Sequence, residues 1–292
     1  MSAVTVVVAS RNRKDQLCHT LERLAGLPEA PGIVVVDNAS DDGTAAEVAR
    51  RFPAVRLLRL PVNIAAAART HGARAAATPY VAFSDDDSWW EPGALARATQ
   101  LFDRHPRLGL LAARTVVQPQ GELDPVSGMM ARSPLREESD LPGRPVLGFL
   151  ACSAVVRRRA FLAAGGFSRL LVIGGEEELL AYDLAAMGWG IAYVPEVVAH
   201  HQPSAARDDA WRQMLQRRNR VLVDWLRRPV RRAIGSTGRL AADARHDRVA
   251  RAALRSALRH LPRALAERHR VPASVERAAL IVEGKNSPPG RH

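Results

Sequence analysis

Short runs of β-branched residues alternate with amphipathic segments along residues 4–84. Residues 4–9 and 33–36 are continuous apolar runs, typical of strands buried on both faces of a parallel sheet. Between them, leucines recur at the spacing of four and three that an amphipathic helix requires, at Leu17, Leu21, Leu24 and Leu27. The alternation continues with a helix expected over 45–52, a strand over 55–60, a helix over 65–77 and a strand over 80–84. This order predicts an α/β fold with a mostly parallel central sheet and helices on both faces.

The pattern changes after residue 116. Proline and glycine are frequent over 117–145, which predicts a long mobile loop. Regular structure is then expected as helices over 158–164 and 176–187 and a strand over 190–194, followed by a turn at Pro195-Glu196. We expect one domain over 1–206, a basic helical region over 207–283 and a disordered tail over 284–292. The helices expected over 207–283 carry an apolar stripe with arginines around it, formed by Trp211, Leu215, Leu222, Trp225 and Leu226.

The charge of the chain is unevenly distributed. The 292 residues carry a net charge of +12, but residues 207–292 hold 21 Lys and Arg against 8 Asp and Glu, so residues 1–206 are nearly neutral. An anionic surface is therefore a candidate partner of the C-terminal region. A nucleic-acid partner is disfavoured, because aromatic residues make up only 5% of the chain and the basic residues do not extend over the first domain.

The composition also favours a reduced protein without a membrane span. Apolar residues make up 47% of the chain, enough for a large core, yet no apolar run reaches the roughly 18 residues that a spanning helix needs. No basic leader precedes the first expected strand. Cys18 and Cys152 lie far apart, which favours two buried, reduced thiols over a disulfide framework or a zinc cluster.

Three adjacent acids, Asp85, Asp86 and Asp87, directly follow an apolar strand. Ligands of α/β sheets bind at this end of the strands. The repulsion among the acids needs a positive partner, and Mg²⁺ or Mn²⁺ carrying a nucleotide diphosphate is a candidate, with Asp85 and Asp87 facing the ion and Asp86 pointing away. The alternative is an acidic turn that caps the helix expected near Pro92.

A second polar segment, residues 37–44, follows the second expected strand. Asp37 at the strand end is placed to accept hydrogen bonds from the base or ribose of a nucleotide. Ser40, Asp41 and Asp42 are more typical of helix caps and turns.

Together these segments resemble the nucleotide-sugar signatures of family 2 glycosyltransferases, in the same order. The resemblance spans about residues 3–203. It rests on the following segments: Ser10-Arg11-Asn12-Arg13, Val36 to Thr44, Phe83 to Asp87, Arg158 to Phe161 with Gly165-Gly166-Phe167, Gly175 to Leu180 with Gly188-Trp189, Tyr193 to Glu196, and His200-His201.

The resemblance implies a GT-A fold with a C-terminal helical extension, a donor half over about 1–116 and an acceptor half over about 146–206. It implies an inverting transfer from a nucleotide-sugar donor to a glycan or lipid-linked acceptor, assisted by Mg²⁺ or Mn²⁺. A cytoplasmic location follows, with a peripheral position at the inner face of the membrane as one option.

The same resemblance assigns roles to single residues. The general base is Glu177, preceded by Glu176, although acids in the first turn of a helix also favour its dipole without any catalytic role. The implied donor-binding residues are Ser10, Arg11, Asp37, Asn38, Arg69, Asp85 and Asp86, and the implied metal ligands are Asp85, Asp87 and His201, the last chosen over His200.

Several positions depart from the family pattern. Thr70 replaces an asparagine after Arg69, Glu177 stands where aspartate is usual, and Leu179 occupies a position that is usually acidic. Ser168-Arg169 replaces a common acidic pair. These departures point to an unusual acceptor and keep a catalytically degenerate scaffold open as an alternative.

Two other enzyme classes fit less well. A nucleotidyltransferase and a dinucleotide dehydrogenase would both carry a glycine-rich phosphate loop after the first strand, where this chain has Ser10-Arg11-Asn12-Arg13. For the C-terminal helices two interpretations remain, an anionic membrane surface under the arginines or packing of the apolar stripe on the first domain.

Overall fold

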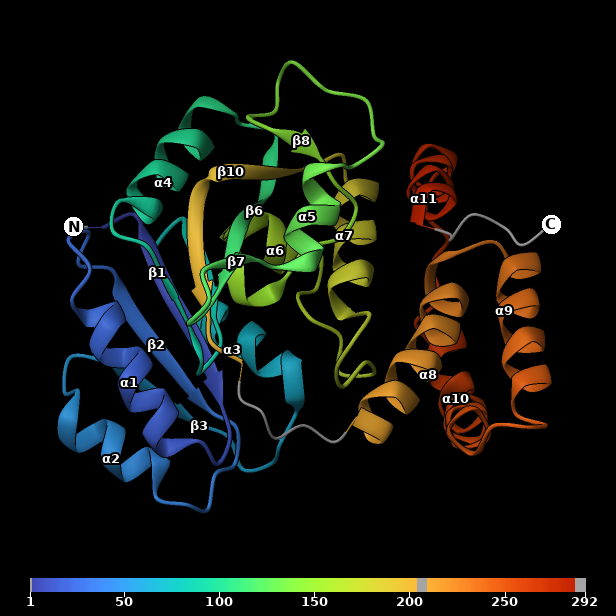
Figure 1. Ribbon diagram of the computed structural model, residues 1–292, viewed down its shortest axis with the longest axis horizontal. Helices are drawn as coiled ribbons and strands as arrows, with labels where there is room; N and C mark the ends of the chain where they lie inside the picture. The colour runs from blue at the N-terminus through green and yellow to red at the C-terminus, as the bar shows by residue number, and fades with distance from the viewer. Residues whose placement is uncertain (1, 204–208, 287–292) are drawn as a thin grey trace.

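A computed structural model describes residues 2–203 and 209–286, which form one mixed sheet, helices on both of its faces, and further helices beside it (Figure 1). The strands are β1 (Val4–Ser10), β2 (Gly32–Asp37), β3 (Arg56–Arg59), β4 (Tyr80–Ser84), β5 (Ser88–Trp90), β6 (Leu108–Val117), β7 (Glu122–Leu123), β8 (Arg144–Pro145), β9 (Ala154–Arg157) and β10 (Gly190–His201). The strands follow the order β3-β2-β1-β4-β9-β6-β10-β5, with β7 paired to β6 and β8 to β10.

The sheet is parallel where the N-terminal strands pair. β1 pairs in parallel with β2 and β4, and β2 with β3, so that Ser10 lies opposite Asp37 at their carboxyl ends. β9 runs antiparallel to both β4 and β6, while β6 and β10 are parallel to each other. The parallel pairs bring the carboxyl ends of β1, β2 and β4 to one edge.

Helices cover both faces of the sheet, as the hydrophobic pattern predicted. The α-helices before the C-terminal region are α1 (Lys14–Ala25), α2 (Thr44–Arg51), α3 (Ala68–Ala75), α4 (Ala94–Arg104), α5 (Pro125–Ala131), α6 (Arg158–Ala163) and α7 (Glu176–Ala186). Apolar residues of α1, α2 and α4 pack on one face, and those of α3, α6 and α7 pack on the other. Short 3₁₀ turns, η1 (Ala65–Ala67) and η2 (Ala151–Ser153), precede α3 and β9.

Three predicted segments differ from the structure. Residues 117–145 contain α5 and the short strands β7 and β8, because Asp124 caps α5 and Pro125 occupies its first turn, where proline is tolerated. β10 continues through Pro195-Glu196 to His201 instead of turning, since a register shift against β6 between Val194 and Val198 accommodates the proline. Residues 284–286 belong to α11, and 287–292, like the expected domain boundary at 206, lie outside the described residues.

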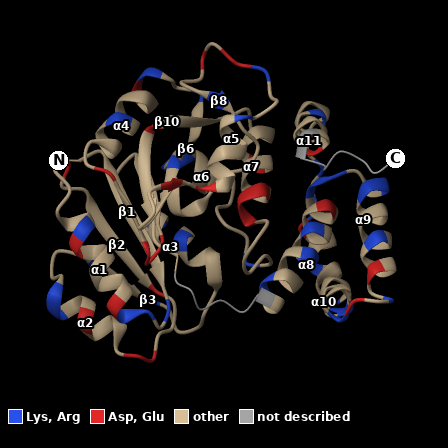
Figure 2. Ribbon diagram, viewed as in Figure 1, with Lys and Arg blue, Asp and Glu red and all other residues tan. Residues whose placement is uncertain are grey.

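The C-terminal helices are α8 (Asp209–Arg227), α9 (Val230–Asp243), α10 (Arg248–Ala266) and α11 (Ala273–Asn286). They lie beside α7 in Figure 1, and basic residues recur along them in Figure 2. Part of the predicted apolar stripe of α8 is buried against α7, because Leu222 and Leu226 share one cluster with Leu179 and Tyr182, whereas Trp211 is 46% exposed. Packing on the first domain, one of the two sequence interpretations, therefore accounts for Leu222 and Leu226.

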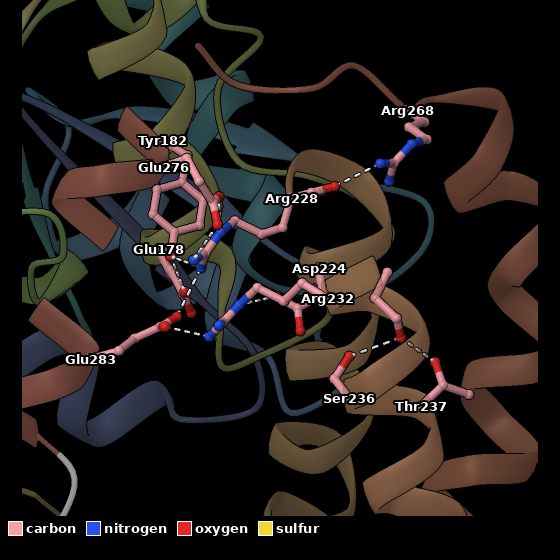
Figure 3. Close-up of polar contacts among 11 residues, drawn as sticks. Glu178, Tyr182, Asp224, Arg228, Arg232, Ser236, Thr237, Arg268, Glu276 and Glu283 are labelled. Atoms are coloured by element: carbon pink, nitrogen blue, oxygen red, sulfur yellow. Dashed lines mark hydrogen bonds and ion pairs between the residues drawn. The ribbon is translucent and has the colours of Figure 1, made fainter. Parts of the chain in front are cut away.

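Several of the C-terminal arginines are buried rather than presented to solvent. Arg227 donates to both carboxylate oxygens of Asp183 on α7, at 2.5 and 2.9 Å. Arg228 has a fully buried side chain and donates to the Tyr182 hydroxyl at 3.0 Å, to Glu276 at 2.5 Å and to Glu283 at 2.8 Å (Figure 3). These arginines join α7 to α8 and α11.

The same helices fix the segment that leads into α7. Arg218 donates to the Leu170 carbonyl at 3.0 Å, and Asn219 donates to the carbonyls of Ile173 and Gly174. Gly175 then begins α7 from a left-handed conformation with φ of 92°. In the described parts of the chain, no helix combines the length and the apolar character that crossing a membrane requires.

We predict that Arg227→Met lowers the free energy of unfolding by about 3 kcal/mol, because among the described residues it leaves the buried Asp183 carboxylate with only His269 as a cationic partner, at 3.2 Å. Denaturant titration of the full chain measures the change. The control is Arg231→Met, at an exposed arginine with no ion pair to the described residues, which we expect to change stability by less than about 0.5 kcal/mol. Equal losses in both variants would contradict a structural role for the Arg227–Asp183 pair.

Candidate active site

Polar side chains gather where β1, β2 and β4 end. Ser10 ends β1, Asp37 ends β2, and the acids Asp85, Asp86 and Asp87 form the tight connection from β4 to β5. All of these except Asp85 are buried. The acids do not cap α4, because its first amide groups Leu95 and Ala96 donate to Glu29 instead. The capping alternative for the three aspartates is therefore wrong.

Asp86 points into the protein, towards the end of β1. It accepts from the Ser10 hydroxyl at 2.8 Å and pairs with Arg13 at 3.0 Å. Burial raises the pKa of Asp86 to about 7, and Arg13 and Ser10 only partly oppose that shift. Asp86 thus joins the ends of β1 and β4.

Asp87 lies between a guanidinium and an imidazole. Its Oδ2 is 3.3 Å from Arg13 Nη1, and its Oδ1 is 3.4 Å from His201 Nε2. His200 turns the other way, where it stacks on Trp89 with ring centroids 5.6 Å apart and contacts Gln118. Of the two histidines, His201 is the one beside the acids.

The donor set at Asp87 fits part of a metal site. A carboxylate oxygen and an imidazole nitrogen 3.4 Å apart can both bind one Mg²⁺ or Mn²⁺ ion, and such ions commonly take their remaining ligands from substrate phosphates and water. Among the described residues there is no cluster of three or more metal-binding side chains. The third predicted ligand, Asp85, is instead ion-paired with Arg69.

Arg69 connects the aspartates to the start of α7. It extends from α3, is largely buried, and pairs directly with Asp85. Burial works against its charge, but Asp85, followed by Glu176 and Glu177, raises the pKa of Arg69. Its guanidinium also lies 5.9 Å from the centre of the Phe167 ring. The Arg69 guanidinium therefore offsets negative charge from two separate segments, the connection after β4 and the start of α7.

Glu176 and Glu177 occupy the first turn of α7, where Glu176 is buried and Glu177 is half-buried. Burial raises the pKa of Glu177, and the adjacent Glu176 charge adds to the shift. Burial likewise raises the pKa of Glu176, whose Oε2 has no hydrogen-bond partner among the described residues. Glu178 faces a different way and accepts from the Tyr182 hydroxyl at 2.5 Å. A raised pKa suits a carboxylate that takes up a proton.

Glu177 also lines a large cavity. The cavity has a volume of about 1110 Å³ and lies between the first domain and the C-terminal helices. Its walls include residues of α5 and 146–149 on one side and of α8, α9 and α11 on the other. Glu177 thus feels the charge of Asp85 at the sheet edge and also lines an open space large enough for a second molecule.

The remaining predicted donor residues have mainly structural contacts. Asn38 donates to the Ala65 carbonyl at 3.2 Å and accepts from the Ile64 amide at 2.9 Å, so both ends of its amide are occupied. Asp37 accepts from the Ser40 amide at 3.0 Å. Arg11 is exposed and donates to the Ala39 carbonyl at 3.5 Å.

Asp42 is the residue of its segment that stabilises helix starts. It accepts from the amides of Lys14 and Thr44, at 3.1 and 3.0 Å, which is the capping role expected from the sequence. Asp41 instead donates its own amide to the Asn12 side chain.

Arg13, which contacts Asp86 and Asp87, was not predicted from the sequence. The motif after β1 contains two arginines, and the resemblance to the family pointed to Arg11. Asn12 between them has φ of 53°, and this left-handed residue turns the chain so that Arg13 faces the acids. Asparagine favours this conformation, but the residue type alone does not show which arginine then faces the acids.

Two departures from the family pattern have structural explanations. Leu179 is buried in the cluster that α7 shares with α8, so an acid there would be covered by apolar side chains. The Thr70 hydroxyl accepts from the Phe167 amide at 2.9 Å, next to Gly166. Leu179 therefore contributes to the packing of α7 on α8, and Thr70 ties α3 to the segment at Phe167 within the first domain.

The sheet, with its acids at the carboxyl edge, defines a GT-A fold. Known structures support this assignment. A mannosyltransferase, PcManGT from Pyrobaculum calidifontis, solved with GDP-Man and Mn2+, matches 97% of this chain and 79% of its own with a TM-score of 0.59 and 21% identity. TarS 1-349 of S. aureus, solved with UDP-GlcNAc, matches 76% of this chain and 66% of its own with a TM-score of 0.57 and 18% identity.

Sequence comparison assigns the family. The family model for glycosyl transferase family 2 matches residues 5–163. An N-acetylglucosaminyl-diphospho-decaprenol L-rhamnosyltransferase of Mycobacterium tuberculosis is 30% identical over 241 residues, covering 70% of this chain and 78% of the relative. The chain belongs to glycosyl transferase family 2 and is a glycosyltransferase, as the ordered motifs indicated.

We predict that Glu176→Gln stabilises the protein at pH 8, by on the order of 1 kcal/mol. The raised pKa of Glu176 means that the folded state binds more protons than the unfolded state above the ordinary glutamate pKa, so wild-type stability falls as pH rises through that window. The glutamine side chain does not titrate, so the stability of the variant does not fall for this reason. Denaturant midpoints from pH 4 to pH 8 measure the difference, which we expect to shrink towards pH 4.

The control for this prediction is Glu137→Gln, at an exposed carboxylate remote from Arg69. We expect its midpoints to follow those of wild type at every pH. A Glu176→Gln curve that also followed wild type would mean that Glu176 is not held in a protonation-sensitive position.

Proposed function

We propose that the protein transfers a sugar from a nucleotide-sugar donor to a hydroxyl group of a lipid-linked glycan acceptor, with inversion at the anomeric carbon and Glu177 as general base. The observation that carries the proposal is the position of Glu177, which feels the charge of Asp85 at the sheet edge and lines the cavity at the C-terminal helices. The relative from Mycobacterium tuberculosis, named for a diphospho-decaprenol acceptor, supports the acceptor class.

In the proposed reaction the Glu177 carboxylate takes the proton of the acceptor hydroxyl while the acceptor oxygen bonds to the anomeric carbon. The bond from that carbon to the diphosphate oxygen breaks, and its electron pair leaves with the nucleoside diphosphate. Inversion follows from this single displacement. A positioned base contributes roughly 10²- to 10⁴-fold to the rate of such a step. The raised pKa of Glu177 suits it to accept a proton.

The donor would lie along the carboxyl ends of β1, β2 and β4. Asp37 and Ser10, opposite each other at the ends of β2 and β1, would contact the base and ribose, and the charges of Asp85 and Arg69 act on Glu177. Asp87 and His201 would hold a divalent cation, which supplies positive charge to the leaving diphosphate. Arg13 keeps Asp87 in place through its contacts with Asp86 and Asp87. PcManGT, which shares the fold and was solved with GDP-Man and Mn2+, supports a nucleotide sugar and a divalent cation as the ligands.

We predict that one of UDP, GDP, dTDP and CDP raises the melting temperature of the protein more with Mn²⁺ than without it, because a ligand that binds only the folded state stabilises it by mass action. Asp87→Ala removes a cation ligand and should abolish the part of the shift that depends on Mn²⁺. Differential scanning fluorimetry measures both. Asp140→Ala, at an exposed carboxylate paired with Arg107, is the control and should keep the full shift.

The absence of a shift with all four nucleotides would contradict donor binding at this edge. A shift that persists unchanged in Asp87→Ala would leave nucleotide binding intact and contradict the role of Asp87 in holding the cation.

We predict that Glu177→Gln lowers the turnover of sugar transfer by roughly 10²- to 10⁴-fold while the nucleotide-induced melting shift is kept, because glutamine cannot take the proton. The matched control is Glu178→Gln, the same change one residue along. Its side chain faces Tyr182 and can still accept that hydrogen bond, so we expect turnover within a few-fold of wild type. Release of nucleoside diphosphate measures the rate, and NMR of the product gives its anomeric configuration.

Near-normal turnover of Glu177→Gln would rule out Glu177 as the base. A product with retained configuration would exclude the single displacement, whatever the effect of the substitution.

A further inference from the structure

The cavity beside Glu177 combines two kinds of surface that a glycan alone would not require. Its apolar part includes Met129 on α5 and Leu280 on α11, side chains that are 46% and 44% exposed although they come from opposite walls. Partly buried Val126 and Leu147 line it further. Large apolar side chains exposed within one concave site typically mark the binding site of an apolar ligand.

The basic part of the cavity lies on α8 and α9. Arg220 and Arg239 are exposed and line the space, and neither pairs with a carboxylate in the part of the chain that the structure describes. Arg217, also in the wall, contacts Asp247 at 2.5 Å. An acid, Asp243, lines the wall one helical turn from Arg239. Two arginines remain available to an anionic group.

The other charged residues of the cavity wall are already paired. Glu283 pairs with Arg228 and Arg232, and Asp224 lies 3.6 Å from Arg232 (Figure 3). Glu178 is bonded to Tyr182. Once these internal pairs are set aside, the charged and apolar side chains left to meet a ligand are Glu177, Asp243, the apolar groups, and the arginines at 220 and 239.

We propose that this cavity is the acceptor site, and that Arg220 and Arg239 bind the phosphate groups of an acceptor whose lipid chain lies against Met129 and Leu280. The inference rests on the proposed function, because Glu177 then faces the sugar hydroxyl at the same cavity. The C-terminal helices thereby select the acceptor, and the phosphate they recognise is that of the acceptor itself rather than of the surrounding phospholipid. Guanidinium groups suit this role, since they bind phosphate through two parallel hydrogen bonds.

The test measures binding of geranylgeranyl diphosphate to the full chain by isothermal titration calorimetry. The donor site is first saturated with Mn²⁺ and the nucleoside diphosphate that gives the melting shift, so that the probe cannot occupy it. We expect the double variant Arg220→Glu, Arg239→Glu to weaken probe binding at least tenfold. The control, Arg255→Glu with Arg259→Glu, makes the same charge change at exposed arginines of α10 outside the cavity, and should bind like wild type.

Two further titrants separate the sources of affinity. Inorganic diphosphate should bind at least tenfold more weakly than the prenylated probe; equal binding would overturn the role of the apolar wall. Vesicles of phosphatidylglycerol should bind both double variants to the same extent. A loss of vesicle binding confined to Arg220→Glu, Arg239→Glu would assign these arginines to the membrane surface and overturn the acceptor site.

The outcomes for the two proposals can be distinguished. If the nucleotide shift and Glu177-dependent turnover are present but both double variants bind the probe like wild type, the acceptor site is wrong and the proposed function stands. If no nucleotide shifts the melting temperature, the proposed function fails first. Melting of each variant without ligand verifies that it is folded.

Discussion

Two arginines hold together the carboxylates on which the site is built. Arg13 contacts Asp86 and Asp87, and Arg69 pairs with Asp85 while its charge acts on Glu176 and Glu177. Without them, five acids from two distant segments would meet in a largely buried region, where like charges about 4 Å apart repel by several kcal/mol at an intermediate dielectric. The same arrangement leaves the glutamates with raised pKa values, because the compensation is incomplete. The stability of this edge of the sheet and the raised pKa values of the two glutamates therefore both depend on how far Arg13 and Arg69 offset the charge of the acids.

The C-terminal helices are part of the same structure and not an appendage to it. Arg218 and Asn219 fix the backbone that leads into α7, Arg227 pairs with Asp183 in its middle, and Arg228 reaches Tyr182. Several of the positive charges of this region are thus paired within the protein. Among the exposed arginines of α8 and α9, Arg220 and Arg239 line the cavity, so the positive charge of this region contributes to one particular site as well as to the packing of the fold.

The sequence predicted most of the fold because the relevant signals are local. Continuous β-branched runs identified β1 and β2, and leucine spacing identified α1, since burial on both faces of a sheet or on one face of a helix dictates such patterns. The strands β5, β6 and β9 were not predicted. β9 and β5 are short, and the apolar residues of β6 precede a segment rich in proline and glycine.

The site was predicted less completely, for a physical reason. Motifs placed the acids at strand ends, where topology brings them together, but contacts between distant segments have no local signature. Arg13 faces the acids through a single left-handed residue, and Asn38 is used to hold a loop. The cavity could not be predicted either, because it forms only where α5 and 146–149 meet helices that follow much later in the chain.

The buried Arg228 has a consequence for the order in which the protein can fold during its synthesis. Its carboxylate partners Glu276 and Glu283 belong to α11, so they leave the ribosome after α7 and α8. A nascent chain that already contains α8 but not α11 would have to bury this guanidinium without them, which is strongly unfavourable. The sheet edge with its three aspartates can form before α11 is made, whereas the final seating of α7, and of Glu177 on it, depends on α11. We therefore expect a chain shortened before α11 to hold Glu177 less firmly beside the acids of the sheet edge.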